Sequence, residues 1–185
     1  LFTNKTLTNV TALLSAMPMT AGVVVNAPPF VNKMLPMSYL YEATEGINVN
    51  TKIGTSTVPL ELTRSVAKIV VKSTVADFTL SGIHSVYNMN KNTVLHNLSG
   101  NLETAASMVD YIRNDANEDF VSATANVTDP IYVYEAKSGT GAYMIIRAFY
   151  KGLESYYKIA IADDELKYID IKRNHEYRFT IISAN

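Results

Sequence analysis

Cysteine is absent from the 185 residues of the chain, and this absence excludes several kinds of chemistry. Without thiols there is no disulfide, no cysteine nucleophile, no cysteine-type zinc site and no iron–sulfur cluster. Tryptophan is absent as well, whereas 12 tyrosines and 6 phenylalanines are present. Because tyrosine and β-branched residues suit a pleated, half-buried surface, this aromatic content favours β-sheet.

Charged residues are few and balanced, since 16 basic and 17 acidic side chains leave a net charge of −1. Neutralising phosphates requires a basic patch, and no cluster of Lys and Arg occurs, so we expect no nucleic acid partner. A hydrophobic content of 48% excludes a disordered chain. No apolar run approaches the roughly 20 residues that a membrane helix needs. The length suits one ordinary domain or two small ones.

The chain opens at Leu1, without a starting Met and without the charged and apolar regions of a signal peptide. This start predicts that a targeting segment has been removed or that the chain is a fragment.

The chain divides into three zones that differ in composition and in hydrophobic pattern. Residues 1–57 are polar, rich in Asn and Thr and interrupted by prolines, which predicts loop with one short helix that ends at Pro18. From residue 58 the pattern alternates, which predicts strands over 59–72 and over 78–88, with a bulge or close backbone approach at Gly82. A turn is expected over 88–92 and a second short helix within 100–117.

The last zone carries the strongest strand signal. Five segments read as strands separated by short turns, namely 131–136, 142–150, 156–162, 168–171 and 175–182. Several strands with close turns and little helix predict an all-β antiparallel sandwich rather than a βαβ sheet.

Few residues suggest catalysis or metal binding. His84, His96 and His175 lack the spacing of a metal-binding pair, and a structural strand or turn role is expected for them. Asp163, Asp164 and Glu165 could contribute to a calcium site, but a solvated hairpin turn is the favoured interpretation. The Gly-containing segment 138–141 is followed by a strand rather than by the helix of a phosphate loop. We expect no catalytic, cofactor-binding or metal-binding residue.

Two stretches of the chain resemble known motifs. Residues 60–69, with Phe78-Thr79-Leu80 and Val86-Tyr87-Asn88, resemble the pattern R-x-x-A-K-I, F-x-L, V-Y-N of the fimbrillins of the Bacteroidales, the subunits of type V pili. Residues 156–160 and 169–177 resemble the Y-Y-R-I and I-x-R-N-H-x-Y hallmark of the same family. The matched motif positions, for which structural roles are expected, are Arg64, Ala67, Lys68, Tyr157, Arg173, Asn174, His175 and Tyr177.

The resemblance implies a transthyretin-like β-sandwich with long loops and one or two short helices, and a structural rather than enzymatic role. Fimbrillins are exported as lipoproteins to the outer membrane, trimmed at an Arg by a surface protease and polymerised by donor-strand exchange. In that process a neighbouring subunit supplies a strand that satisfies an open sheet edge and an apolar groove. The implied partners are therefore other fimbrial subunits, with any host or bacterial ligand unknown.

The chain departs from the family pattern in two respects. It has no lipobox Cys, and its first Arg is Arg64, inside the motif, so no trimming site is visible upstream. The expectation is one fimbrillin-type domain over 1–185, part of a longer precursor, with a loop-rich portion at 1–57 and the main strands at 58–185. A non-polymerised surface adhesin or glycan-binding module with a tyrosine platform is the alternative, and a hydrolase with two facing carboxylates is a third.

Overall fold

The computed structural model describes residues 17–18, 35, 37–39, 61–90, 92–93, 102, 108–112 and 119–184. This part of the chain is almost entirely β-sheet, with one short 3-10 turn, η2 (Ser138–Thr140). None of its helical segments is long and apolar enough to span a membrane. The strands are β1 (Met17–Pro18), β2 (Met37–Ser38), β3 (Thr63–Arg64), β4 (Val66–Ser73), β5 (Phe78–Asn90), β6 (Asn92–Thr93), β7 (Met108–Ile112), β8 (Val121–Thr124), β9 (Val127–Thr128), β10 (Ile131–Tyr134), β11 (Tyr143–Tyr150), β12 (Leu153–Ala160) and β13 (Glu176–Ile181).

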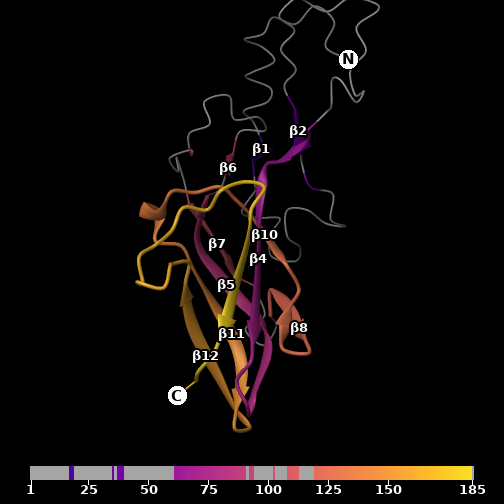
Figure 1. Ribbon diagram of the computed structural model, residues 1–185, viewed down its shortest axis with the longest axis vertical. Helices are drawn as coiled ribbons and strands as arrows, with labels where there is room; N and C mark the ends of the chain where they lie inside the picture. The colour runs from indigo at the N-terminus through magenta and orange to yellow at the C-terminus, as the bar shows by residue number, and fades with distance from the viewer. Residues whose placement is uncertain are drawn as a thin grey trace, which may run out of the picture.

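The main strands form two layers of a β-sandwich, which confirms the predicted all-β class (Figure 1). One layer has β4 between β10 and β13. The other has β11 between β12 and β5, and β5 also pairs with β7 and β8. The hairpin of β8 and β9 pairs with β5 and with β4, so it joins the two layers along one side.

The pairing of β13 with β4 is parallel, whereas the other pairings among the described strands are antiparallel. A parallel neighbour needs a long connection, and residues 161–175 supply it. This connection contains a small hairpin, closed by the bridge between Ala162 and Tyr168, and a second bridge from Ile171 to Ala136. The strand predicted over 168–171 is therefore wrong, because these residues form only isolated bridges.

The core lies where alternate residues of both layers face each other. On β4 the inward residues are Ala67, Ile69 and Val71, all fully buried, and on β11 they are Met144, Ile146 and Ala148. The outward residues between them include Lys68 and Arg147. This period of two explains why the long strands were predictable from the sequence.

Two local predictions are wrong. The helix expected within 100–117 is contradicted at residues 108–112, which form strand β7. The turn expected over 88–92 is contradicted because β5 continues to Asn90. Asn88 does adopt a left-handed φ of 58°, but within a register shift of the β5–β7 pairing rather than in a turn. Of the helix expected to end at Pro18, the structure describes only Met17 and Pro18, and these form strand β1 rather than helix.

Gly82 is a point of close backbone approach, as predicted. The register of β5 against β11 shifts on both sides of it, so residues 81 and 84 are extra residues in the strand. A Cβ atom placed on Gly82 would lie 2.1 Å from the carbonyl oxygen of Val121. Only glycine lets β8 pair with β5 at this distance.

Candidate functional site

The two stretches that resemble fimbrillin motifs meet in space at the start of β13. The N–H of Asn174 donates to the carbonyl of Val66 at 2.8 Å, and the N–H of Lys68 donates to the carbonyl of His175 at 2.9 Å. The Arg64 guanidinium donates to Oδ1 of Asn174 at 3.0 Å. Asn174 adopts a left-handed φ of 58°, which an Asn tolerates. The turn 173–175 is thus fixed to β3 and β4, and it sets the register of β13.

A buried ion pair anchors the same turn to the end of β10, which lies on the other side of β4 from β13. Arg173 donates from Nε to Oε2 of Glu135 at 2.8 Å and from Nη2 to Oε1 at 2.6 Å. The Glu135 side chain is 2% exposed and that of Arg173 is 12% exposed. Nη2 of Arg173 also donates to Oγ1 of Thr93 at 3.2 Å. Bidentate geometry and extra hydrogen bonds are what a buried ion pair requires to offset its desolvation.

The remaining motif residues have separate positions. Nδ1 of His175 lies 2.8 Å from the carbonyl oxygen of Arg173, which is the turn contact expected of this residue. The Tyr177 hydroxyl donates to the carbonyl of Asp170 at 2.9 Å and accepts the N–H of Lys172 at 2.8 Å. Burial raises the pKa of the Tyr177 hydroxyl. Ala67 is a core residue on β4. Tyr157 lies on β12, in the other layer, with its ring centroid 5.5 Å from that of Phe78.

A groove of about 410 Å³ adjoins the motif turn on the outer face of the first layer. Its floor includes the buried Val66, and Met37, 40% exposed, lies at its margin. Lys68 donates to Glu176 at 3.2 Å across the groove, and this hydrogen bond, with a second from Arg178, lowers the pKa of Glu176. The positive charge of Lys68 is therefore already matched by a carboxylate.

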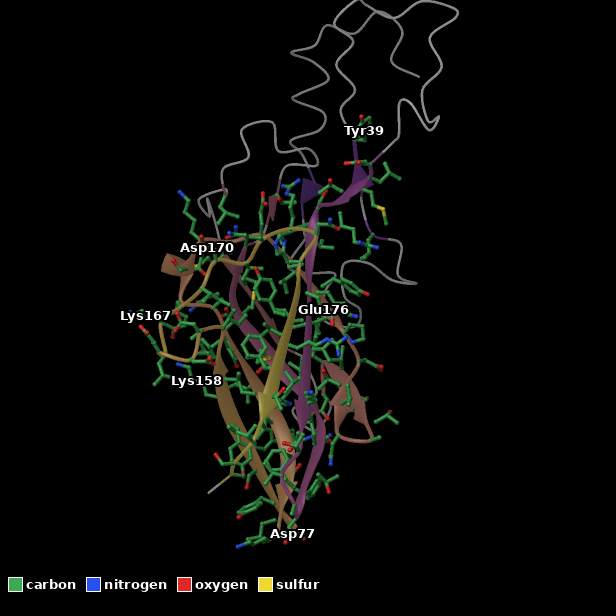
Figure 2. The ribbon with its side chains drawn as sticks, viewed as in Figure 1. Tyr39, Asp77, Lys158, Lys167, Asp170 and Glu176 are labelled. Atoms are coloured by element: carbon green, nitrogen blue, oxygen red, sulfur yellow. The ribbon has the colours of Figure 1, made fainter. Side chains whose placement is uncertain are left out.

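The opposite side of the sandwich from the β8–β9 hairpin is open. There β12 pairs only with β11, and β13 pairs only with β4, as far as the described strands show. Between these two edges lies a groove of about 480 Å³. Figure 2 marks its surroundings with Lys158 on β12, Lys167 on the connection and Glu176 on β13. The apolar residues that line it are Ile159, Ala162, Leu166, Ile169, Tyr177, Phe179 and Ile181.

The inward face of β12 is incompletely covered. Tyr157 and Ile159 point inward but are only half-buried, and Leu153, on the same face, is 73% exposed. On the neighbouring strand β11 the inward residues are fully buried. Ile182, just after β13, is also exposed. Within the part of the chain that the structure describes, the open side therefore combines two unpaired edges with accessible apolar side chains.

The acidic cluster at 163–165 lies at the margin of this open groove and forms a self-contained turn. Oδ1 of Asp163 accepts the backbone N–H groups of Glu165 and Lys167, each at 3.0 Å. The Glu165 carboxylate pairs with Lys167. These bonds fit the interpretation of a solvated hairpin turn rather than a calcium site.

A second ion-pair cluster, not predicted from the sequence, covers the outer face of the second layer. Arg147 binds Asp119 through two hydrogen bonds of 2.9 Å, and Ser81 donates to Asp119 at 2.9 Å. The hydrogen bonding of the Arg147 guanidinium to the Asp119 carboxylate raises the pKa of Arg147. Nδ1 of His84 lies 3.9 Å from Oδ1 of Asp119, and its ring packs edge-on against Tyr156. The sequence feature that could have pointed to this cluster is Gly82, because the close backbone approach at Gly82 brings Asp119 over β5.

Stability at high pH should depend on Tyr134. Burial raises the pKa of its hydroxyl from 10.0 to about 12. Because the folded state holds this proton more tightly, its contribution is complete below pH 10 and is lost as the pH rises through about 12. We expect the free energy of unfolding to fall by about 2 to 3 kcal/mol across this window. Urea unfolding measured on both sides of it should show a smaller fall in Tyr134→Phe, and an equal fall would contradict the assignment.

No protein-family model and no curated protein matches the chain. Nine chains among the solved structures match this one, and they include the following three. The C-terminally truncated tip fimbrial protein Mfa3 from Porphyromonas gingivalis is 17% identical over 73% of this chain and 56% of its own, with a TM-score of 0.47. A candidate cell adhesion protein from Bacteroides fragilis is 12% identical over 68% and 45%, with a TM-score of 0.43. Another from Bacteroides uniformis is 12% identical over 70% and 51%, with a TM-score of 0.35. The chain thus spans about half the length of the structures that it resembles.

Proposed function

We propose that the chain is a structural subunit of a cell-surface fimbria that joins a neighbouring subunit by accepting one of its β-strands. The observation that carries this proposal is the open side of the sandwich, where β12 and β13 both leave an edge unpaired among the described strands and the groove between them is apolar. A strand placed there would satisfy backbone groups and cover apolar surface together. A head-to-tail contact that does not close on itself generates a filament.

The contacts of the motif residues support a structural role. Arg173, Asn174 and His175 fix the turn that begins β13, and β13 is one wall of the groove. A strand with a free edge needs such anchoring if it is to receive a partner without itself detaching. Through the same motif resemblance, the proposal includes export to the outer membrane, a lipidated precursor and release of the acceptor groove by proteolytic trimming. It includes no catalytic step.

The tyrosine platform of a glycan-binding module receives less support. The ring of Tyr87 stacks on that of Tyr143 with centroids 4.7 Å apart and an interplanar angle of 10°. The Nζ of Lys158 lies 4.1 Å from the Tyr143 ring centroid. Tyr156 packs against His84. These rings make cross-strand contacts with one another and with neighbouring side chains, which is the ordinary use of aromatics on a sheet.

Immunogold electron microscopy of cells that produce the full-length protein tests the proposal. We expect the label to lie along surface filaments. In detergent gels of unheated samples, we expect a ladder of bands from oligomers that remain joined. Phe179→Lys places a charge in the groove and should reduce the amount of labelled filament at least tenfold.

Thr79→Lys is the matched control, because it adds the same charge on the exposed, outward face of β5, outside the groove. It should leave the filaments intact. Circular dichroism of both purified variants establishes that each is folded. Label on the cell surface without filaments, together with a monomeric purified protein, would reject the fimbrial role and favour the non-polymerised adhesin.

A further inference from the structure

We infer that the incoming strand adds to the free edge of β13, rather than to that of β12, and so extends the β10–β4–β13 layer across the inward face of β12. This inference rests on the proposed function and specifies which edge is used. It follows from the direction of the backbone groups of β13, from the difference in burial between β11 and β12, and from the lining of the groove.

The backbone groups on the free edge of β13 can be identified. The carbonyl of His175 accepts from Lys68, and the carbonyl of Ile181 accepts from Thr74. In a parallel ladder alternate residues bond to the same neighbour, so Tyr177 and Phe179 also face β4. Glu176, Arg178 and Thr180 therefore direct their N–H and C=O groups away from β4. These three residues are exposed, and Arg178 and Thr180 line the open groove.

The two layers differ in width on this side. The inward residues of β11 are fully buried beneath the first layer, whereas Tyr157 and Ile159 of β12 are half-buried. Figure 1 shows β13 beside β4, with β12 at the outer margin of the other layer. Among the described strands, the first layer therefore ends one strand short of covering β12, and a strand beside β13 would fill that position.

Addition to β12 would leave this apolar surface uncovered. The two-residue turn at Lys151 and Gly152 pairs Tyr150 with Leu153, so Leu153, Ser155, Tyr157 and Ile159 face β11 through their backbones. The free edge of β12 then consists of Glu154, Tyr156 and Lys158. A strand there would widen the second layer and expose still more unpaired apolar face. Hydrophobic burial therefore favours the edge of β13.

The position also dictates the side-chain pattern of the incoming strand. Its side chains alternate between the two faces of the extended layer. One set would contact Tyr157 and Ile159 and must be apolar, whereas the other set lies in line with Arg178 and Thr180 on the solvent side. The partner is thus a strand of a neighbouring subunit with alternating apolar and polar residues.

The absence of cysteine from the chain permits a clean crosslinking test. The probe is a set of synthetic peptides of about nine residues that alternate Val with Thr or Lys, with one Cys at each polar position in turn. Thr180→Cys on β13 and Lys158→Cys on β12 are matched sites, since both side chains lie on exposed, outward faces. Under mild oxidation we expect at least tenfold more disulfide-linked product with Thr180→Cys, measured by intact mass. Replacing the Val residues by Ser should remove this product.

Two proline variants give an independent measurement on the same edges. Arg178→Pro removes an N–H that faces the open groove, and Tyr156→Pro removes one from the free edge of β12, so neither breaks an existing ladder bond. We expect Arg178→Pro to abolish peptide capture and Tyr156→Pro to leave it unchanged, with both variants folded by circular dichroism.

The outcomes separate the two proposals. Preferential capture by Lys158→Cys, or loss of capture only in Tyr156→Pro, overturns the choice of edge while the fimbrial role stands. Capture at neither edge also overturns the choice of edge, and the filament labelling described above then decides the fimbrial role by itself. Capture that survives replacement of Val by Ser overturns the predicted side-chain pattern.

Discussion

Replacing Arg173 by Ala is expected to lower the free energy of unfolding by about 3–5 kcal/mol. The substitution leaves the Glu135 carboxylate, 2% exposed, in the protein interior without the guanidinium that binds both of its oxygens. It also loosens the turn that begins β13, because Arg173 links that turn to β10 and to Thr93. Urea unfolding measures the effect as a shift in midpoint at an unchanged slope.

Lys68→Ala is the matched control, since it removes a motif cation whose ion pair with Glu176 is about one-third exposed on both sides. Exposed pairs contribute roughly 0–1 kcal/mol, so this variant should remain close to the parent protein. Replacing both members of the buried pair, as Glu135→Leu with Arg173→Met, should recover much of the lost stability, because no unpaired charge remains. Equal losses in Arg173→Ala and Lys68→Ala would contradict the assignment of Arg173 as a buried anchor.

Replacing Gly82 by Val is expected to destabilise the fold by about 3 kcal/mol, at the upper end of the usual cost of overpacking. A Cβ atom there would lie 2.1 Å from the carbonyl oxygen of Val121 and 2.9 Å from Cβ of Asp119. Because the first of these is a backbone atom, a side-chain rotation cannot relieve the overlap, and β8 must move away from β5. Such a movement would also disturb the Asp119–Arg147 pair, so a lower melting temperature is the expected measurement.

Gly139→Ala provides the comparison, since a Cβ at Gly139 meets no atom within 4 Å. Its melting temperature should change little, because surface substitutions away from special features usually alter stability by less than about 0.5 kcal/mol. If Gly82→Val melts at the same temperature as Gly139→Ala, the close approach of β8 is not the reason for glycine at residue 82.

Alternating hydrophobicity predicted the long strands well, because each has one face on a single core. The segments that became β4, β5, β11, β12 and β13 all had this pattern, and the turns at Lys151–Gly152 and Arg173–Asn174 carried recognisable turn residues. The short strands β8 and β9 were not predicted. β8 has four residues and β9 has two, which is too short to show an alternation of apolar and polar residues. The turn between them, at Ala125–Asn126, also lacks glycine.

The parallel pairing of β13 with β4 and the ion pairs could not be predicted from the sequence. The register of β13 against β4 joins residues 108 positions apart, such as Lys68 and Glu176. Glu135 and Arg173 are 38 positions apart, and no local pattern relates them. The motif resemblance did single out Arg173, but only the folded structure identifies Glu135 as its partner. The open groove is likewise a property of two edges that are not adjacent in the chain.

The parallel direction of β13 has a mechanical consequence. Its register with β4 runs from Glu176 opposite Lys68 to Ile181 opposite Ser73. A tensile force applied to the chain after Ile181, with the first layer held at the opposite end, would act along the strand axis. The slanted, evenly spaced bonds of this ladder would then be loaded in shear together, whereas a peeling force would break them one at a time. Traction along the axis of the sandwich is thus the direction in which this edge strand resists extraction most strongly.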